Sequence, residues 1–473
     1  MKVSDVHDLP SGIEFLKGRQ RPFRLIETPL SPLAEITSDF ALAGGGVPSR
    51  HNLKPCPPSL YAAPRGHDIP VLVGLFNRRE DCALLLGMEP RQLARTLHQN
   101  ITGDYPVRQV AFPPCQEKVF DQAIDLTRLL PILTCSKEDA GPYVTMGLLY
   151  AADPETAEED VTIHRFCVQG PNLLSVYFVP GRHIERFYLK AKTQGRPLPV
   201  TINIGLDPAI YLVAAFTYPA CPLGFNELNV AGSLRRRGVE VAPALSVPAR
   251  SLAHAEIVLE GEILPESIDE NQSDPQGRSV PEFMGYIGEA KRNLPLIRIK
   301  AVTTKKKPIY QCLIGPGAEQ SNILGIPTET SLYKLVREAI TDKLIDVHCD
   351  PSGGGKLSAV MQFKKSHPLD DAVVRQAGVA AFAAFHELKH VFLVDDDVDI
   401  YDQRDVLWAL HTRFQGDHSL IPIPGLNGHP LDPSQSPGFS PRLREVGTTC
   451  KCVFDCTAPF AMKAHFKRAD FVL

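Results

Sequence analysis

The segment from His254 to Leu264 reads HAEIVLEGEIL, and it has the alternation and β-branched residues of a strand. Three other runs in the middle of the chain share this character: Leu173–Val179, Val200–Ile204 and Leu296–Val302. Helical stretches such as Arg182–Lys192 interrupt them. This concentration of strands predicts a β-barrel or a β-sandwich with helical insertions.

The sequence on either side of this β-rich middle mixes helices and strands. The first hundred or so residues combine strand-like and helix-like pieces, and prolines 106, 113 and 114 mark a boundary after them. Beyond residue 306, helical patterns at Thr330–Lys343 and Leu369–Glu387 alternate with a buried strand at Val391–Val394. Such alternation is typical of a layered α/β domain.

These patterns predict an α+β multidomain fold in three parts. Residues 1–110 form a mixed α/β domain, residues 111–305 the β-rich domain, and residues 306–473 the C-terminal α/β domain. Within the last part, residues 421–441 hold six prolines and several glycines, so we expect a long loop there.

Composition excludes several classes of protein. The 473 residues include 50 basic and 54 acidic side chains, a net charge of −4 that argues against nucleic acid as a partner. No apolar run follows Met1, and the uncharged stretch Pro208–Asn226 is broken by three prolines, so we expect neither a secretory signal nor a membrane span. Eleven cysteines without a signal indicate free thiols in a reducing cytoplasm.

One short motif points to zinc. His386, Glu387 and His390 fit H-E-x-x-H. That motif needs a continuous helix to place both imidazoles on one face, whereas Val391–Val394 reads as a strand. We therefore expect the helix to end near His386, so that the two histidines do not share a face. A zinc hydrolase that uses His386, Glu387 and His390 is the alternative hypothesis.

Four segments in the β-rich middle carry the residues best suited to catalysis. They are Asp160–Arg165, Pro180–Ile184, Gly224–Glu227 and Ser279–Tyr286. Two acids and an imidazole among them form a mixed oxygen and nitrogen set that suits a divalent cation. Two arginines add forks that match phosphate, and Glu282 is a candidate proton donor.

In this order the segments resemble the UbiD decarboxylase family, whose members act on aromatic and heteroaromatic acids. The resemblance extends from about Val144 to Asp455 and includes the ending Asp455–Pro459. It implies a central flavin-reductase-like split β-barrel that binds prenylated FMN, and a C-terminal domain, residues 306–473, that serves oligomerisation.

The resemblance also implies how the cofactor is held. A manganese-type divalent ion would bind its phosphate, with a potassium ion beside it. The metal ligands fall on Asp160, His183 and Glu227, with Asp in place of the family's usual Asn. The other implied cofactor contacts are Thr162, Ile163, His164, Arg165, Arg182, Ala214, Ala215 and Lys389.

At its catalytic centre the family has an Arg–Glu–Glu network. Arg165 matches the arginine, and Glu282 matches the glutamate that protonates the product carbon. The other glutamate has no match at its usual place, where Gln276 stands. Asp274 and Glu270 are alternatives, and the sequence leaves this choice open.

These matches imply a reversible, non-oxidative decarboxylase of an aromatic or heteroaromatic acid, with Glu282 as proton donor. A flavin prenyltransferase is implied as cofactor supplier, and a homodimer or homohexamer as the assembly. The polar run Glu319–Asn322 either faces the substrate or lies in a surface loop. Because the second Glu is missing, a non-catalytic accessory subunit of a decarboxylase is the other alternative.

Overall fold

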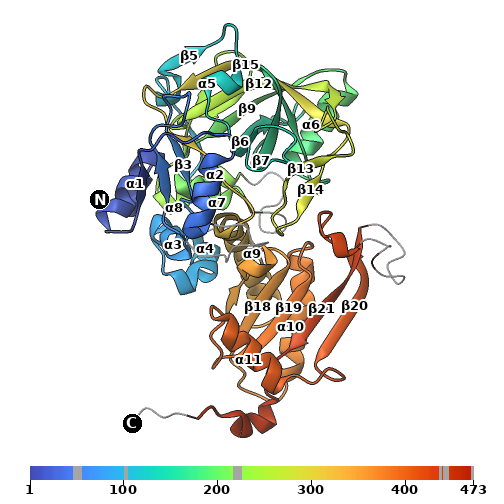
Figure 1. Cartoon of the computed structure of the whole chain (residues 1–473). Helices are drawn as coiled ribbons and strands as arrows, with labels where there is room; N and C mark the ends of the chain where they lie inside the picture. Colours follow the sequence, from blue (N-terminus) through green and yellow to red (C-terminus); the bar gives the residue numbers. More distant parts are fainter. Residues whose placement is uncertain (46–55, 101–104, 217–225, 436–438, 440–446, 470–473) are drawn as a thin grey trace. The chain divides into compact units, whose positions relative to one another are not determined.

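A computed structural model describes the chain except for residues 46–55, 101–104, 217–225, 436–438, 440–446 and 470–473 (Figure 1). The described residues divide into two compact units. The first contains Met1–Pro90, Asn100–Phe216 and the described part of Cys221–Ile323. The second contains Arg91–Gln99 and the described part of Leu324–Leu473. The three predicted domains stay a prediction.

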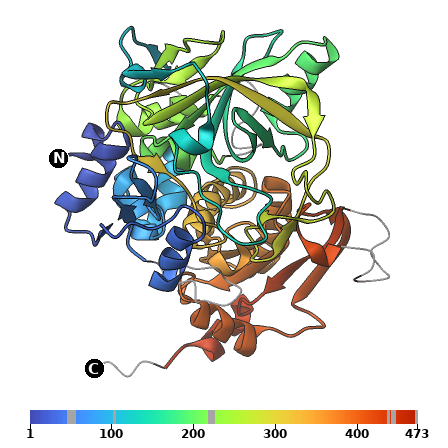
Figure 2. The same cartoon turned by 45° about the horizontal axis from the view of Figure 1, so that its top comes forward.

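The first unit is built around a closed antiparallel β-barrel, visible as the green and yellow strands of Figures 1 and 2. Its strand order is β12-β9-β6-β7-β8-β15, and β15 pairs with β12 to close the ring. The six strands are β6 (Tyr143–Ala152), β7 (Glu159–Gly170), β8 (Leu173–Val176), β9 (Leu198–Ile204), β12 (Ile257–Ile268) and β15 (Leu294–Thr304). This confirms the predicted split barrel and the α+β class.

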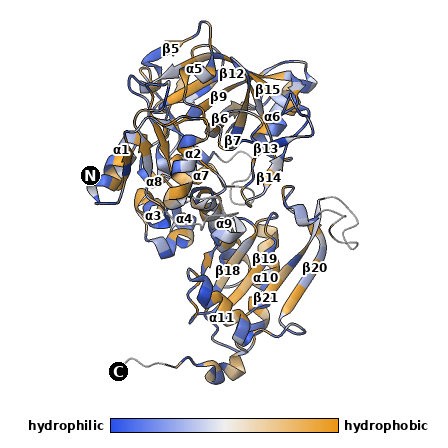
Figure 3. Cartoon of the chain, in the orientation of Figure 1, coloured by the Kyte–Doolittle hydropathy of each residue, from blue (hydrophilic) through white to orange (hydrophobic). Residues whose placement is uncertain are grey.

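Alternate residues of these strands fill the interior of the unit. All six strands contribute to one hydrophobic cluster, in which Ile202 of β9, Leu259 of β12 and Ile299 of β15 are fully buried. Burying one such side chain is worth roughly 1.5–3 kcal/mol. Hydrophobic residues, orange in Figure 3, are accordingly frequent on the strands.

Helix α6 (His183–Thr193) packs on the same core. Its buried residues Ile184, Phe187, Tyr188 and Ala191 recur at helical spacing and belong to the barrel cluster. The sequence predicted this helix within one residue at each end. Its first residue, His183, is one of the predicted metal ligands, so the packing of the apolar face of α6 fixes the backbone position of His183.

Shorter elements complete the first unit. One small sheet contains β1 (Arg24–Ile26), β2 (Ser59–Tyr61), β3 (Val71–Val73) and β16 (Tyr310–Gln311), and a second contains β4 (Arg108–Gln109), β10 (Glu240–Pro243) and β11 (Arg250–Leu252). A third is the pair β13 (Arg278–Pro281) and β14 (Ile287–Glu289). Strand β5 (Lys118–Phe120) pairs antiparallel with β15. The helices are α1 (Leu9–Gly18), α2 (Glu35–Phe40), α3 (Arg79–Leu86), α5 (Leu126–Leu129), α7 (Pro208–Val213) and α8 (Glu227–Arg235). Because β3 pairs with β16, the N-terminal sheet takes a strand from far along the chain.

The second unit is a layered α/β domain. Its sheet has the order β17-β18-β19-β21-β20, formed by β17 (Leu344–His348), β18 (Ser358–Phe363), β19 (His390–Asp395), β21 (Thr448–Asp455) and β20 (Leu420–Asn427). One face packs on α9 (Ala318–Ala339), which begins in the first unit, and on α10 (Asp370–Ala384). The other face packs on α11 (Gln403–Arg413). Helix α4 (Leu93–Asn100) adds Ala94 to the first of these cores.

The proline-rich loop predicted at 421–441 is wrong for its first seven residues. They belong to β20, which pairs antiparallel with β21 from Leu420 to Asn427. Proline lacks an N–H for the ladder and is tolerated on edge strands, and β20 is at the end of the sheet order, so Pro422 and Pro424 fit there. Residues 436–438 and 440–441 lie outside the described part of the chain.

The barrel requires glycine at position 147. A Cβ added to Gly147 would lie 2.5 Å from Cε2 of Phe166 and 2.7 Å from Cγ2 of Ile202, both fully buried. We expect Gly147→Ala to lower the free energy of unfolding by about 1–3 kcal/mol, the usual cost of overpacking. At Gly170 the nearest atom to a new Cβ is 3.5 Å away, so Gly170→Ala is the matched control. Urea denaturation of both variants tests this, and equal stabilities would contradict it.

Candidate active site

Strand β7 carries five of the predicted site residues. Asp160, Thr162 and His164 alternate along the strand and share one face, and Oγ1 of Thr162 donates to Oδ2 of Asp160 at 3.0 Å. Arg165 is at an odd offset and belongs to the opposite face. One strand therefore presents a metal-ligand side and an arginine side.

Arg165 is brought to two glutamates. Its Nη1 donates to Oε2 of Glu282 at 2.7 Å, and its Nη2 lies 3.8 Å from Oε1 of Glu270. Both carboxylates are almost fully buried, with 6% of Glu282 and 2% of Glu270 exposed. Burial works to lower the pKa of Arg165, but the charge and hydrogen bond of Glu282, with the charge of Glu270, outweigh it and raise that pKa.

The sequence left three positions open for the second carboxylate of the network, and only one of them, Glu270, lies near Arg165 in the structure. Glu270 follows β12, accepts a hydrogen bond from the Tyr143 hydroxyl at 3.1 Å and accepts another from the backbone N–H of Lys291 at 3.0 Å. Gln276 and Asp274 are exposed, and Asp274 accepts the backbone N–H of Gln276 instead. Glu270 therefore completes the Arg–Glu–Glu group.

One carboxylate oxygen of Glu282 accepts no hydrogen bond from the described residues. This oxygen, Oε1, is buried. Gly288 lies beside it, and a Cβ there would be 2.7 Å from that oxygen. The glycine thus leaves room next to an acid whose other oxygen is fixed by Arg165.

The three predicted metal ligands come together in part. Nδ1 of His183 and Oδ1 of Asp160 are 3.2 Å apart, and both Asp160 and Glu227 are 4% exposed. Burial raises the pKa of Glu227 well above its usual value, and the charge of Asp160 adds to the rise. Among the described residues, this trio is not a group whose ligand atoms all lie within 4.8 Å of one another.

Four buried polar atoms of the predicted site residues lack a hydrogen-bond partner among the described residues. They are Oε2 of Glu227, Oε1 of Glu282, Nε2 of His164 and Nε of Arg165. Buried polar atoms are usually hydrogen-bonded, so these four mark where a ligand would supply partners. Two adjacent buried carboxylates also repel each other unless a cation lies between them.

The other predicted cofactor residues are placed as follows. Arg182 precedes α6, Ala214 and Ala215 follow α7, and Ile163 lies on β7. His164 is half-buried, and desolvation of its ring together with the nearby Arg182 charge lowers its pKa to about 3. Lys389 lies in the second unit, where its Nζ donates to Asp432 at 2.7 Å and to Ser434.

The H-E-x-x-H residues do not share a helix. Helix α10 ends at Ala384, and His390 is the first residue of β19. Oε2 of Glu387 accepts from Nζ of Lys356 at 2.6 Å. The local structure therefore lacks the helical face that a zinc protease motif requires.

The polar run Glu319–Asn322 is not a surface loop. It forms the start of α9, where the buried Glu319 carboxylate accepts the backbone N–H groups of Gly74 at 2.9 Å and Phe76 at 3.1 Å. Burial raises the pKa of Glu319 to about 7, against these hydrogen bonds, which lower it. Asn322 donates to the carbonyl of Phe76 at 2.8 Å. The side chains of Glu319 and Asn322 therefore form hydrogen bonds with the backbone of the segment that follows β3.

Sequence reasoning missed two supporting side chains. The Tyr143 hydroxyl bonds Glu270 and lies 3.4 Å from Oγ of Ser279, which in turn lies 3.5 Å from Nη2 of Arg165. Tyr143 begins β6 and reads as an ordinary apolar strand residue, so no local signal marks it. Ser279 begins the Ser279–Tyr286 segment, and its residue type alone does not mark it as a contact of Arg165.

With the barrel and the Arg–Glu–Glu group in place, comparison with known proteins shows the class of protein, which is a carboxy-lyase. Residues 108–318 match the 3-octaprenyl-4-hydroxybenzoate carboxy-lyase Rift-related domain, and residues 321–456 match the C-terminal domain of the same enzyme. The chain is 37% identical to gallate decarboxylase of Lactiplantibacillus plantarum, over 98% of this chain and 97% of the relative. It therefore belongs to the UbiD family of aromatic acid decarboxylases.

Solved structures show the same relationship. The apo 3,4-dihydroxybenzoic acid decarboxylase from Enterobacter cloacae is 44% identical with a TM-score of 0.94, covering 99% of this chain and 97% of that one. The UbiD-class enzyme HmfF from Pelotomaculum thermopropionicum, solved in complex with FMN, is 30% identical with a TM-score of 0.86, covering 98% and 97%. A dimeric form of HmfF, 29% identical, was solved with prenylated FMN.

We expect Glu270→Gln to lower decarboxylase turnover by roughly 10–100-fold, because removing one buried carboxylate changes the charge balance around Arg165. Asp274→Asn, an exposed change four residues away, is the control and should leave turnover near the wild-type value. Steady-state rates measure both. Adding Gln276→Glu to the Glu270 variant should not restore activity, since position 276 is exposed; rescue by that change would show that the second carboxylate acts from 276.

Proposed function

We propose that the protein catalyses reversible, non-oxidative decarboxylation of a hydroxylated benzoic acid with prenylated FMN as cofactor and Glu282 as proton donor. The single observation that carries this is the pairing of the half-buried Arg165 with the buried Glu282 at 2.7 Å, with Oε1 of Glu282 left without a described partner. An acid that is fixed at one oxygen and open at the other is suited to deliver a proton to a positioned carbon.

Bound prenylated FMN would supply the electron-poor centre that accepts the electrons released as CO₂ leaves. The residues of this chain do the rest. Arg165 orients the site and balances the two glutamates, and Glu282 gives its proton to the carbon that has lost its carboxylate. Overall one carboxylate leaves as CO₂ and one proton takes its place, so no net oxidation occurs.

The cofactor assignment draws support from relatives and from the donor set. HmfF has been solved with FMN and, in a dimeric form, with prenylated FMN. Asp160, His183 and Glu227 would hold a manganese-type cation, which would supply positive charge for the cofactor phosphate, since carboxylates and an imidazole suit such an ion. Potassium, a flavin prenyltransferase as supplier, and Lys389 as a phosphate ligand are parts of the same proposal.

The substrate class follows from the relatives with the highest identities among those described. One is a gallate decarboxylase and the other a 3,4-dihydroxybenzoic acid decarboxylase. A benzoic acid with two or more phenolic hydroxyls is therefore the first substrate to test, and heteroaromatic acids are the second.

None of the described helices is long and apolar enough to cross a membrane. We further propose a cytoplasmic homo-oligomer.

Glu282→Gln should abolish turnover and leave cofactor binding intact, because the amide keeps the shape of the side chain but cannot donate the acid proton. The test uses the chain co-expressed with a flavin prenyltransferase. CO₂ release from 3,4-dihydroxybenzoate and from gallate gives turnover, and the absorbance and mass of the bound flavin give loading. Glu266→Gln, an exposed change near the end of β12, is the control.

Deuterium incorporation separates this proposal from its rival. In D₂O the wild-type chain should exchange the ring hydrogen of the decarboxylated product, and the Glu282 variant should not. Retained turnover in that variant would overturn the role of Glu282. A loaded wild-type chain that is inactive alone, but active with a second protein, would favour the accessory subunit.

A further inference from the structure

A second cluster of ligand-type side chains lies at the edge of the first unit, on segments the proposed reaction does not use. His7 and Asp8 precede α1, and His254 lies between β11 and β12. One ligand atom from each of these three residues falls within 4.8 Å of the others. Of the described residues, only these three form such a group.

We propose that His7, Asp8 and His254 bind a borderline divalent cation of the zinc class. Two imidazoles and one carboxylate form a ligand set found in open zinc and iron sites. The cofactor set of Asp160, His183 and Glu227 has the opposite balance, with two carboxylates and one imidazole. Imidazole-rich sites favour zinc, copper or nickel over manganese.

The hydrogen bonds around the two imidazoles point to the same use. Nδ1 of His7 lies 2.8 Å from the carbonyl oxygen of Asp5, which can only accept, so this nitrogen carries the hydrogen. Nε2 of His254 lies 2.7 Å from Oε2 of Glu240 and donates to it in the same way. Metal-binding histidines are held in this manner through their second nitrogen.

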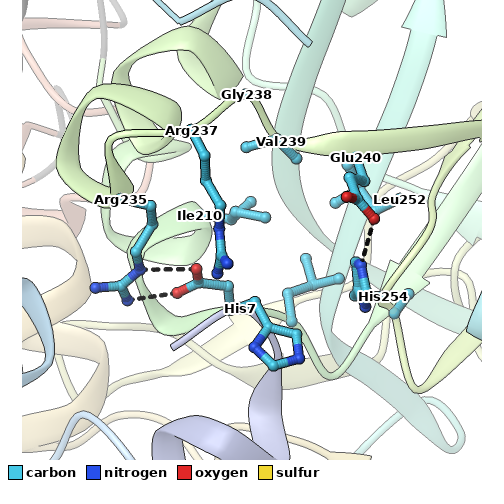
Figure 4. Close-up of a pocket in the computed structure, with 12 residues that line it drawn as sticks. His7, Ile210, Arg235, Arg237, Gly238, Val239, Glu240, Leu252 and His254 are labelled. Carbon is cyan, nitrogen blue, oxygen red and sulfur yellow. Dashed lines mark hydrogen bonds and ion pairs between the residues drawn. The ribbon is translucent and has the colours of Figure 1, made fainter. Parts of the chain in front are cut away.

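This arrangement leaves Nε2 of His7 and Nδ1 of His254 to bind the cation. The two rings meet edge to face with centroids 5.3 Å apart. In Figure 4 the His254 ring lies between Glu240 and His7. A neutral imidazole held by an acceptor on one side presents a lone pair on the other.

Asp8 has capacity for a third contact. Its Oδ1 accepts from the backbone N–H and the hydroxyl of Ser11, and its Oδ2 accepts only from Nζ of Lys305, at 2.7 Å. Lys305 also pairs with Glu256 at 2.8 Å and so does not offset both carboxylates. Because Lys305 competes for Oδ2, we expect weaker binding than at a closed four-ligand zinc site.

Space for further ligands adjoins the cluster. His7 and His254 line a cavity of about 180 Å³ that Glu240, Arg237 and Ile210 also line (Figure 4). A water takes about 30 Å³, so water can complete the coordination. The bound ion would tie the segment before α1 to the loop before β12.

The test is zinc binding by the full-length chain, freed of any histidine tag and treated with a chelator. Calorimetric titration with ZnCl₂ should include a binding event that His7→Ala and His254→Ala each weaken by more than about tenfold. Glu240→Gln should weaken it by roughly 10–100-fold through the orientation of His254. His411→Ala, which changes an exposed histidine on α11, should change nothing.

Two further measurements keep the result clear. Glu227→Gln should leave this site intact, which separates it from the cofactor site. Co²⁺ bound to the wild-type chain should give visible absorption bands that the His254→Ala variant lacks. If circular dichroism shows that His254→Ala is unfolded, His254→Asn is used instead. Zinc binding of equal stoichiometry and affinity in the wild type and the His7→Ala/His254→Ala variant would overturn the proposal.

Discussion

The double pairing of β12 is the constraint on which both sites depend. This strand pairs with β9 on one edge and with β15 on the other, and so closes the barrel. Closure fixes both ends of the strand, so residues just before and after it are positioned by the barrel. Glu270 follows one end and reaches Arg165, while His254 precedes the other and reaches Glu240.

Arg165 forms a short ion pair with Glu282, at 2.7 Å, and has Glu270 at 3.8 Å, so the two glutamates differ in how they meet the arginine. Both oxygens of Glu270 accept hydrogen bonds, one from Tyr143 and one from the backbone of Lys291. Glu282 has one oxygen bound and one open. The geometry thus supports Glu270 as the carboxylate held at both oxygens, and Glu282, paired with Arg165, as the carboxylate with one oxygen open to a substrate.

Much of the fold could be predicted from sequence because strand and helix periodicity is local. The helix at α6 and the end of α10 before His390 follow from residue pattern, whereas the roles of the β7 residues came from the family resemblance. Glu270 could not be chosen over Asp274, because an irregular loop, not a periodic element, decides which acid turns inward. The edge strand β20 was missed because its prolines signal a loop unless the pairing partner is known.

Ligand chemistry allows the two metal sets to coexist in one unit. The proposed cofactor set has two buried carboxylates and a half-buried imidazole, a combination that would suit a hard cation. The set at His7 and His254 is rich in imidazole and partly exposed, which suits a borderline cation with water ligands. A zinc-class ion still binds most sites more tightly than manganese does. Under the two proposals, the contrast in ligand type and burial, rather than affinity alone, would separate the two ions.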